Sequence, residues 1–418
     1  MDIYLVKPGD TLYHIAHQFH VPMDQLIQDN TLYHPERLVV GQALVVRRPE
    51  RTRGVQAGEN LRTIAEEVGL SIGALLRQNL TLHGKEQISP GQSLVLSYEG
   101  SKLCHPLTLL GGVSPRQSQE ALPFLTAPLS APYQFTPGGV LIPPVHQPMI
   151  HNGQYAESRP LLVVQDHITK VKQSSQLVHE LLNNQQSRKT FHSQLMSILD
   201  KTDGQGVLIS FSYVDVEDAH TYIQFLEELR HSLPHDIVLV TALPARIFED
   251  SSICGLLCGQ ISQTVDLVLI TQTAPCHAAP GPLFPVSELE ALLQKVLIHI
   301  PPEKCILELS GVGYDWPLPY QPNVSPTPLP STESIRLAWE HHTSIRRDHL
   351  EGFPWFRYTD DFGLEHQVHF QDPINLLSQL NIVENYNLYG IFFSSIEDIS
   401  LENLTLLDSK FCIRELLK

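Results

Sequence analysis

The chain has 418 residues, of which 42% are hydrophobic and 17% are charged, a composition typical of well-packed globular domains. Its formal net charge is −17, and nearly all of the negative excess lies after residue 97. Because such an acidic body repels phosphate backbones and anionic lipids, we expect neither nucleic acid nor a membrane as a partner. No run reaches the roughly 18 to 20 apolar residues of a membrane span, and the first residues, MDIYLVKPGD, lack the layout of a signal peptide.

Cysteine and histidine are scattered along the chain and do not form ligand sets. Cys254 and Cys258 are one helical turn apart, and only the dipeptide Cys276-His277 offers a further pair. None of the 21 histidines belongs to an HExxH or similar pattern. We therefore expect no metal and no cofactor, and we expect the six cysteines to be reduced and mostly buried.

An internal repeat occupies the first 97 residues. The first copy, YLVKPGDTLYHIAHQFHVPMDQLIQDN followed by LVVGQALVV, is matched by RGVQAGENLRTIAEEVGLSIGALLRQN followed by ISPGQSLVL. The spacing between equivalent residues is 49 positions for most of the unit. The recurring residues are Val6, Gly9, Leu12, Ile15, Ala16, Leu26 and Asn30, which become Val55, Gly58, Leu61, Ile64, Ala65, Leu75 and Asn79.

Each copy predicts a short strand, a turn through glycine, two helices and a closing strand. Apolar residues in the first helix recur at i, i+3, i+4 and i+7, which is the spacing of an amphipathic helix. Either Asp10 or Thr11 can cap this helix, and either Glu59 or Asn60 can cap its counterpart. A βααβ unit of this size has a small core, which favours a binding module over an enzyme.

The two copies resemble LysM modules, which bind the N-acetylglucosamine backbone of peptidoglycan or chitin in a shallow groove between the first turn and the loop after the second helix. Two modules in series imply avidity on a repeating polymer. Leu12, Leu61 and both asparagines can equally be residues that maintain the fold, and the asparagines are suited to tie down the turn after the second helix. Carried over position by position, the groove residues are Gly9, Asp10, Thr11, Leu12, Asn30, Leu38, Gly58, Glu59, Asn60, Leu61, Asn79 and Ile88.

From about residue 105 onward, apolar runs alternate with helix-like stretches such as AHTYIQFLEELRHSL. This pattern predicts a parallel sheet buried on both faces, and the number of runs suits a (β/α)8 barrel of the α/β class. A Pro-rich segment and a hairpin with DDFG as its turn predict a small α+β insertion at about 314–372. The barrel strands are expected at 124–130, 161–165, 206–213, 237–243, 265–271, 305–310 and 388–394.

The landmarks of this region resemble glycoside hydrolase family 18, and within it the LysM-bearing enzymes of bacterial spores that cut cortex peptidoglycan during germination. The landmarks are SAPYQFTPGGVLIP, GVLISFSYVDVEDAHTYIQFLEELR, VTALPA, IPPEKCILELSGVGYDWPLPY and FRYTD, in that order. Family 18 enzymes carry D-G-x-D-x-D-x-E on the fourth strand. The last Glu protonates the glycosidic oxygen, and the Asp before it orients the acetamido group that attacks the anomeric carbon.

Serines replace the two working acids when this motif is laid on the chain. Gln205 and Leu208 stand at the first two acidic positions. Ser210 stands where the assisting Asp belongs, and Ser212 stands where the acid/base Glu belongs. A serine hydroxyl is neither a useful proton donor nor a charge that steadies the intermediate. A serine nucleophile is not expected either, because no G-x-S-x-G elbow is present and no base is identifiable.

Acids beyond the motif could in principle replace the lost pair. Asp215 and Glu217 follow Ser212 by a few residues, and a carboxylate on a mobile loop could swing inward. The simpler interpretation is that Glu217 and Asp218 begin the following helix, where acids favour the positive end of the helix dipole.

Other substrate-holding positions of the family have also changed. The M-x-Y of the sixth strand corresponds to Thr271 and Thr273, and the Trp near the end of the last strand corresponds to Ser394. The NYGYDW of the spore enzymes has become GVGYDW. The residues expected in the barrel cleft are Tyr213, Thr271, Thr273, Tyr314, Asp315, Trp316 and Ser394.

We therefore predict LysM modules at 1–48 and 51–97, a linker at 98–120 and a family 18-like barrel at 121–418. The expected function is that of a peptidoglycan-binding spore or cell-wall protein whose barrel is a non-catalytic scaffold or binds glycan or a partner. An active spore cortex-lytic N-acetylglucosaminidase and a general receptor for chitin fragments are the alternatives. The resemblance implies peptidoglycan or another N-acetylglucosamine polymer, and proteins of the spore coat or cortex, as partners. It also implies a place in the spore coat, cortex or cell wall, after synthesis in the cytoplasm without a signal peptide.

Overall fold

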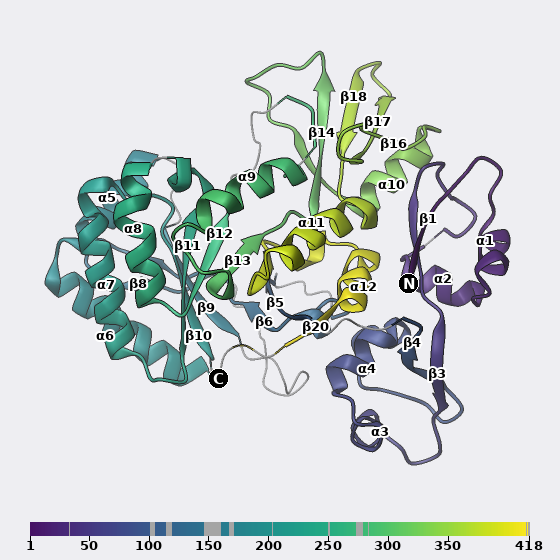
Figure 1. The fold of residues 1–418 in the computed structure, drawn as a ribbon, viewed down its shortest axis with the longest axis horizontal. Coiled ribbons are helices and arrows are strands. Elements are labelled where there is room, and N and C mark those ends of the chain that lie inside the picture. The colour runs from purple at the N-terminus through teal and green to yellow at the C-terminus, as the bar shows by residue number, and fades with distance from the viewer. Residues whose placement is uncertain are drawn as a thin grey trace.

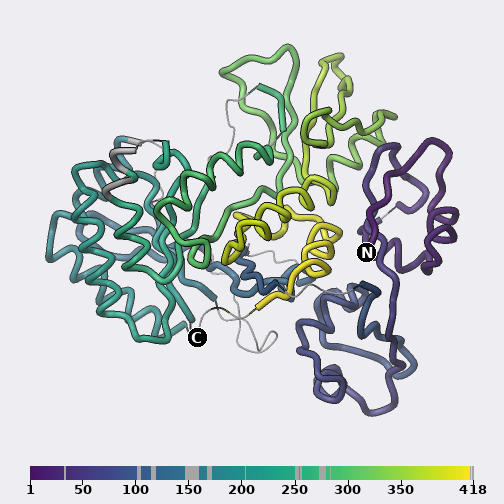
Figure 2. Tube along the Cα trace, viewed as in Figure 1, coloured from purple at the N-terminus to yellow at the C-terminus, as the bar shows by residue number. Residues whose placement is uncertain are grey.

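The computed structural model describes residues 1–418 except 33, 101–104, 114–118, 146–159, 167–170, 203, 250, 273–278, 283, 415, 417 and 418. Two small modules lie beside a large barrel, and a small antiparallel sheet projects from the barrel at the top of the view (Figure 1). The trace in Figure 2 shows that the last helices of the chain, in yellow, lie next to the N-terminal modules, in purple and blue.

Each module has the predicted order of strand, helix, helix and strand, and its two strands pair in antiparallel fashion. The side chain of Thr11 accepts a hydrogen bond from the His14 N–H at 3.3 Å, and Asn60 accepts one from the Thr63 N–H at 2.9 Å. These contacts identify Thr11 and Asn60 as the helix caps. The elements are β1 (Asp2–Leu5), α1 (Leu12–Phe19), α2 (Met23–Asp29) and β2 (Ala43–Val46), then β3 (Pro49–Gly54), α3 (Leu61–Val68), α4 (Ile72–Gln78) and β4 (Ser93–Tyr98).

Eight parallel strands form a closed barrel, because the last strand, β19, pairs with the first, β5. This confirms the predicted (β/α)8 fold. The strands in spatial order are β5 (His105–Gly112), β6 (Ala127–Leu129), β9 (Leu161–Gln165), β10 (Gly206–Ser210), β11 (Val238–Pro244), β12 (Leu267–Thr271), β13 (Cys305–Glu308) and β19 (Gly390–Phe393). The helices of the barrel are α5 (Val171–Leu182), α6 (Gln185–Thr202), α7 (Ala219–Ser232), α8 (Ser251–Thr264), α9 (Val286–Val296), α11 (Pro373–Asn385) and α12 (Leu401–Lys410).

The barrel begins earlier than the sequence suggested. Residues 98–120 were expected to be a linker, but they contain β5, which lies between β19 and β6 in the barrel. The pair Gly111-Gly112 at its end resembles a loop in sequence. In the structure, a Cβ atom on Gly112 would lie 2.2 Å from the carbonyl oxygen of Ser394, so glycine is needed for the close approach of β5 to the end of β19.

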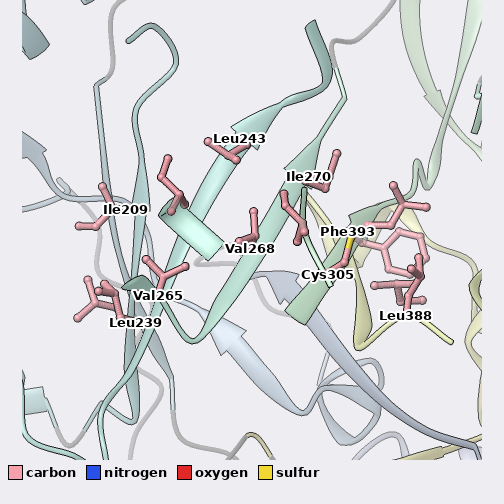
Figure 3. Close-up of a cluster of buried hydrophobic side chains, with 14 of the residues drawn as sticks. Ile209, Leu239, Leu243, Val265, Val268, Ile270, Cys305, Leu388 and Phe393 are labelled. Carbon is pink, nitrogen blue, oxygen red and sulfur yellow. The ribbon is translucent and has the colours of Figure 1, made fainter. Parts of the chain in front are cut away.

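Alternate residues of the barrel strands serve two separate cores. Leu208, Leu269 and Ile306 pack together in the barrel interior. The residues between them point outward and pack under the helices. Figure 3 shows part of this outer layer, including Ile209 and Val268. Because the strands are buried on both faces, they appear in sequence as continuous apolar runs.

The predicted insertion follows β13 and forms a five-stranded antiparallel sheet with one helix. The DDFG segment is the turn between β17 and β18, as predicted, and Asp360 closes it by accepting the Phe362 N–H at 2.9 Å. The elements are β14 (Val312–Leu318), β15 (Thr327–Pro330), α10 (Ser331–Glu340), β16 (Arg346–Arg347), β17 (Pro354–Thr359) and β18 (Glu365–His369). Three short strands complete the chain: β7 (Gln134–Phe135), β8 (Leu141–Ile142) and β20 (Phe411–Ile413).

Both modules are docked on the rest of the chain. In the second module, Arg77 donates to Asp408 on α12 at 2.7 Å and to the carbonyl of Pro123 at 2.8 Å. In the first module, the carbonyl of Val40 accepts the Ile345 N–H of the insertion at 2.9 Å. The modules are therefore held by hydrogen bonds to two separate parts of the chain.

The expectation that all six cysteines are reduced is wrong for one of them. Cys254, Cys258 and Cys305 are free and buried, whereas Cys412 is disulfide-bonded. Cys276 lies outside the described residues. In the described part of the chain, no group of three or more acidic, histidine or cysteine side chains could hold a metal ion. Within the same residues, none of the helices has the length and apolarity that crossing a membrane requires.

Candidate functional site

A cavity of about 430 Å³ opens at the carboxyl ends of the barrel strands, which is where active sites lie in this architecture. Its floor is apolar and includes Leu208, Leu269 and Phe392. Hydroxyl groups surround this floor. They come from five of the described lining residues: Ser130, Ser210, Thr271, Ser394 and Ser395. The cavity therefore combines an apolar surface with hydroxyl groups and one acidic residue, Glu397, which follows β19.

The β10 motif contributes two residues to this cavity. Leu208 and Ser210 line it, while Ile209 and Phe211 belong to the outer core under the helices. Gln205 lies just before β10, at the opposite end of the barrel, where its carbonyl accepts the Val238 N–H at 3.0 Å. Ser210, at the third acidic position of the motif, therefore lines the cavity, because alternate residues of a strand face the same side. Gln205, at the first acidic position, lies at the other end of the strand and far from the cavity.

Ser212 is engaged with Asp166, a buried residue that directly follows β9. Asp166 Oδ1 accepts both the Ser212 N–H at 2.7 Å and the Ser212 hydroxyl at 3.0 Å, and the other oxygen accepts the Ser174 hydroxyl. The Ser212 carbonyl accepts a hydrogen bond from Arg246, whose guanidinium lies 3.9 Å from the ring centre of Tyr213. These contacts bind the end of β10 to its two neighbouring strands.

The two candidate rescue acids lie away from the cavity. Asp215 and Glu217 belong to the exposed turn before α7, and neither is among the described residues that line the cavity. Asp215 accepts a hydrogen bond from the Ser175 hydroxyl. The next acid, Asp218, is buried and accepts from Asn183 at 2.7 Å, so it fixes the packing of α7 against α5.

A carboxyl group that the motif did not indicate lies on a different strand. Glu308 is the last residue of β13. Its Oε2 accepts the Gln272 N–H at 2.7 Å, and its carbonyl accepts the Gln272 amide at 2.8 Å. Burial raises the pKa of Glu308 to about 7, although the Gln272 N–H opposes this effect. In sequence, Glu308 is one polar residue in the run CILELS, which has no motif that could have singled it out.

Three residues expected in the cleft belong to β14 of the insertion instead. Trp316 is only 1% exposed and packs against the rings of Tyr314 and His369, so its face is not open to a sugar. Asp315 accepts the Tyr358 hydroxyl at 2.7 Å within the same sheet. The cleft prediction is therefore wrong for Trp316, because the antiparallel register of β14 and β18 turns its side chain into the insertion. Thr273 lies outside the described residues.

The first turns of the two modules form exposed surfaces. Gly9 and Gly58 have φ angles of +86° and +87°, a region that favours glycine, and both lie in open space. Thr11 and Asn60, next in the turns, are exposed although their side chains cap the helices. Each turn is closed by an acid, since Asp10 accepts the Lys7 N–H at 2.7 Å and Glu59 accepts the Gln56 N–H at 2.7 Å.

The other predicted groove residues support the fold. Asn30 is buried, and its side chain bonds the carbonyl oxygens of Leu26 and Val45 at 2.9 and 2.7 Å and accepts the Val45 N–H at 2.6 Å. Asn79 makes the equivalent contacts in the second module. Leu12 and Leu61 are buried in the module cores, and Leu38 and Ile88 are half-buried against them.

The substitution Asn30→Ala is expected to destabilise the first module by about 2 to 3 kcal/mol, because it leaves buried backbone groups without partners. Urea unfolding followed by the fluorescence of the full chain measures the effect. Gln18→Ala, on the exposed face of α1, is the matched control and is expected to change stability by less than about 0.5 kcal/mol. Equal effects of the two substitutions would contradict the structural role of Asn30.

A closed parallel barrel with a cavity at the carboxyl ends of its strands, preceded by two βααβ modules, defines a modular protein of the glycoside hydrolase type. The chain belongs to the glycosyl hydrolases family 18, whose model matches residues 172–398, and it has LysM domains at residues 4–47 and 55–97. Both resemblances expected from the sequence are thereby confirmed.

Relatives with the same architecture extend over the whole chain. The cortical fragment-lytic enzyme of Bacillus anthracis is 26% identical over 432 residues, with 99% of each chain covered. The crystal structure of the Bacillus cereus spore cortex-lytic enzyme SleL is 25% identical with a TM-score of 0.78, and that of Bacillus megaterium QM B1551 is 22% identical with a TM-score of 0.79. Each of these two structures covers 99% of this chain and is itself covered to 99%.

Proposed function

We propose that this protein binds the peptidoglycan of the spore wall through its LysM modules and that its barrel binds glycan without hydrolysing it. The observation that carries the proposal is the end of β10, where Ser210 stands in the cavity and Ser212 is bonded to Asp166. Family 18 chemistry needs an acid at the second of these positions and a carboxylate at the first. Proton transfer by a positioned acid contributes about 10²–10⁴-fold to such a reaction, so its loss leaves little activity.

Three features support glycan binding. The module turns at Gly9 and Gly58 are exposed, and the barrel cavity has hydroxyl groups above an apolar floor, a lining suited to a sugar ring. The relatives named above are lytic enzymes of the spore cortex, which supports cortex peptidoglycan as the polymer and the spore wall as the location. Two modules on one chain increase the affinity for a repeating polymer through effective concentration.

The proposal predicts that the purified full chain sediments with spore peptidoglycan but releases no soluble fragments from it. The sedimented fraction and the muropeptides in the supernatant are measured together, with the cortical fragment-lytic enzyme of Bacillus anthracis as the positive control for release. Release that survives Ser212→Ala but is abolished by Asp215→Ala or Glu217→Ala would show that a rescue acid is at work and would refute the non-catalytic barrel.

The module turns are tested separately by Thr11→Asp combined with Asn60→Asp. Aspartate is also a good helix cap, so the fold is retained, but each substitution replaces a side chain that can donate a hydrogen bond by one that only accepts. We expect sedimentation to weaken about tenfold or more, since both modules are affected and their avidity is lost. Gln18→Glu makes the same donor-to-acceptor change elsewhere on α1 and should leave sedimentation unchanged. Equal sedimentation of the turn variant and this control would contradict binding at the turns.

A further inference from the structure

The small antiparallel sheet of the insertion is covered on one face. There, Phe356 of β17 and Val368 of β18 pack with Ala338 of α10 in a buried core. Successive residues of a strand point to opposite faces of a sheet, so Trp355 and Arg357 of β17 lie on the face turned away from α10. Trp355 is half-buried and Arg357 is exposed. This second face therefore presents an indole ring and a cation outside the core of the insertion.

Two arginines flank Trp355 on this face. Arg346 of the edge strand β16 is in register with Trp355 and so points to the same side, and Arg357 lies two residues further along β17. Their guanidinium carbons lie 5.6 and 6.0 Å from the centre of the indole ring. In the stacking contact between Arg37 and Trp339, the corresponding distance is only 3.9 Å. Arg346 and Arg357 therefore stand beside Trp355 instead of stacking closely on it, and we call the surface of these three residues the indole face.

Neither arginine of the indole face has an acidic partner among the residues that the structure describes. The other two arginines of the insertion do have one. Arg336 bonds Glu333 at 2.7 Å and Glu340 at 2.6 Å, and Arg347 bonds Asp372. The chain as a whole carries a net charge of −17. Two cations without a counter-charge, beside one aromatic ring, thus form a positive surface in an acidic protein, and such a surface is suited to an anionic ligand.

A chain of hydrogen bonds fixes the arrangement of these side chains. Arg357 Nε donates to Gln367 Oε1 at 2.8 Å, and Gln367 Nε2 donates to His369 Nε2 at 2.8 Å. Burial lowers the pKa of His369 to about 4, so its ring is neutral at pH 7 and can accept from the amide. The ring also stacks on Trp355, with the ring centres 6.2 Å apart and an angle of 18° between the planes. The indole face is therefore ordered before a ligand arrives, and of the Arg357 nitrogens only Nε is engaged within the described part of the chain.

The first module is docked at the edge of the indole face. The carbonyl of Val40 accepts the N–H of Ile345, the residue before Arg346, at 2.9 Å. Gly41 has a φ angle of +87°, and a Cβ atom there would lie 2.1 Å from the carbonyl oxygen of Ile345, so the contact requires glycine. Figure 1 shows β16 beside this module. The indole face thus adjoins a part of the chain that we propose to bind glycan.

We infer that the indole face binds a peptide-bearing muramic acid residue of peptidoglycan, with Trp355 against the sugar ring and both arginines on a carboxylate of the peptide. An aromatic ring offers an apolar surface to a sugar, and the planar guanidinium matches a carboxylate through two parallel hydrogen bonds. A polymer of N-acetylglucosamine alone has no carboxylate, so this face lets the protein distinguish peptidoglycan from chitin. The inference rests on the proposed function, because it names the class of sugar that the wall-binding protein prefers.

Calorimetry of the full chain tests the inference with the disaccharide dipeptide of peptidoglycan as the probe. The same compound with its carboxylates converted to amides is the matched probe without charge. We expect the wild type to bind the carboxylate form about tenfold or more tightly than the amide form, because hydrogen bonds between charged groups are the strong ones. Arg346→Gln combined with Arg357→Gln should bind both forms with the affinity of the amide form. Unchanged binding of the amide form shows that this variant is folded.

Arg336→Gln combined with Lys295→Gln is the matched control. It removes two positive charges from α10 and α9, away from the indole face, and should keep the preference for the carboxylate form. The fluorescence of Trp355, assigned by its loss in Trp355→Phe, gives a local readout in the same samples. We expect this fluorescence to change when the carboxylate form binds.

Three results would overturn the inference: equal affinity of the wild type for the two probes, a preference that survives in the double arginine variant, or fluorescence of Trp355 that ignores the bound probe. Sedimentation with spore peptidoglycan would still support the proposed function in each of these cases. Failure of the wild type to sediment would refute the proposed function. A preference for the carboxylate form that disappears in the double arginine variant would, even then, support recognition by the indole face.

Discussion

Ser210→Asp combined with Ser212→Glu is expected to raise the hydrolysis of N-acetylglucosamine oligomers by about 10²-fold over the wild-type chain, the lower end of what general acid catalysis contributes. The first substitution puts a carboxylate on the cavity wall, where it can orient an acetamido group. The second puts a carboxyl beside Asp166, whose negative charge raises the pKa of a neighbouring acid and keeps it protonated for donation. The gain stays at the lower end because Thr271 and Ser394 still replace substrate-holding residues of the family.

The matched control is Ser210→Asn combined with Ser212→Gln, which has nearly the same size and shape but no acid. The rate of product formation is followed by chromatography of the oligomers over the pH range 4 to 8. If the Asp/Glu variant and the Asn/Gln variant hydrolyse the oligomers at equal rates, restoring the two acids is not enough for catalysis, and the barrel has lost other groups that hydrolysis needs. Thermal unfolding of both variants checks that the end of β10 tolerates the larger side chains.

Asp29→Ala is expected to destabilise the N-terminal part of the chain by about 3 to 5 kcal/mol, because it leaves a buried guanidinium without its counter-charge. Asp29 and Arg47 are 1% and 3% exposed, and Asp29 Oδ1 lies 2.5 Å from Arg47 Nη2. The guanidinium also lies 4.0 Å from the ring centre of Tyr98 in the second module. Gln25 links the same groups, donating to Asp29 at 2.8 Å and to the Tyr98 hydroxyl at 3.0 Å. Loss of Asp29 should therefore loosen the contact between the modules as well as the first module itself.

Urea unfolding of the full chain measures this effect. A Tyr98→Trp substitution, introduced into each variant, gives a fluorescence signal that reports the contact between the modules. Glu340→Ala breaks the exposed ion pair with Arg336 on α10 and is expected to cost less than about 0.5 kcal/mol. Asp29→Leu combined with Arg47→Met removes both charges and should recover most of the stability. If the double variant is as unstable as Asp29→Ala, packing and not the unpaired charge explains the loss.

The modules and the class of the barrel could be predicted from sequence because both depend on local patterns. The repeat at 49 residues and the apolar spacing of Leu12, Ile15 and Ala16 are enough for a small βααβ unit, and the structure places these side chains in one core. Buried parallel strands appear as apolar runs wherever they occur, so seven of the eight barrel strands were recognised. The position of Ser210 in the cavity also followed from sequence, since the alternation of a strand decides which motif residues face inward.

Closure of the barrel and packing between distant segments decided the features that the sequence did not predict. β5 became the eighth strand because Gly112 allows β19 to approach, a contact between residues almost 300 positions apart that leaves only two glycines as a local trace. Trp316 turned away from the cleft because its strand pairs within the insertion. The bond from Ser212 to Asp166 and the bond from Gln272 to Glu308 depend on the register between neighbouring strands, which hydrogen bonds of the folded barrel set. Sequence thus determined that serines stand at the acidic positions of β10, and only the tertiary structure decided that the acidic residue described in the cavity lining is Glu397, after β19.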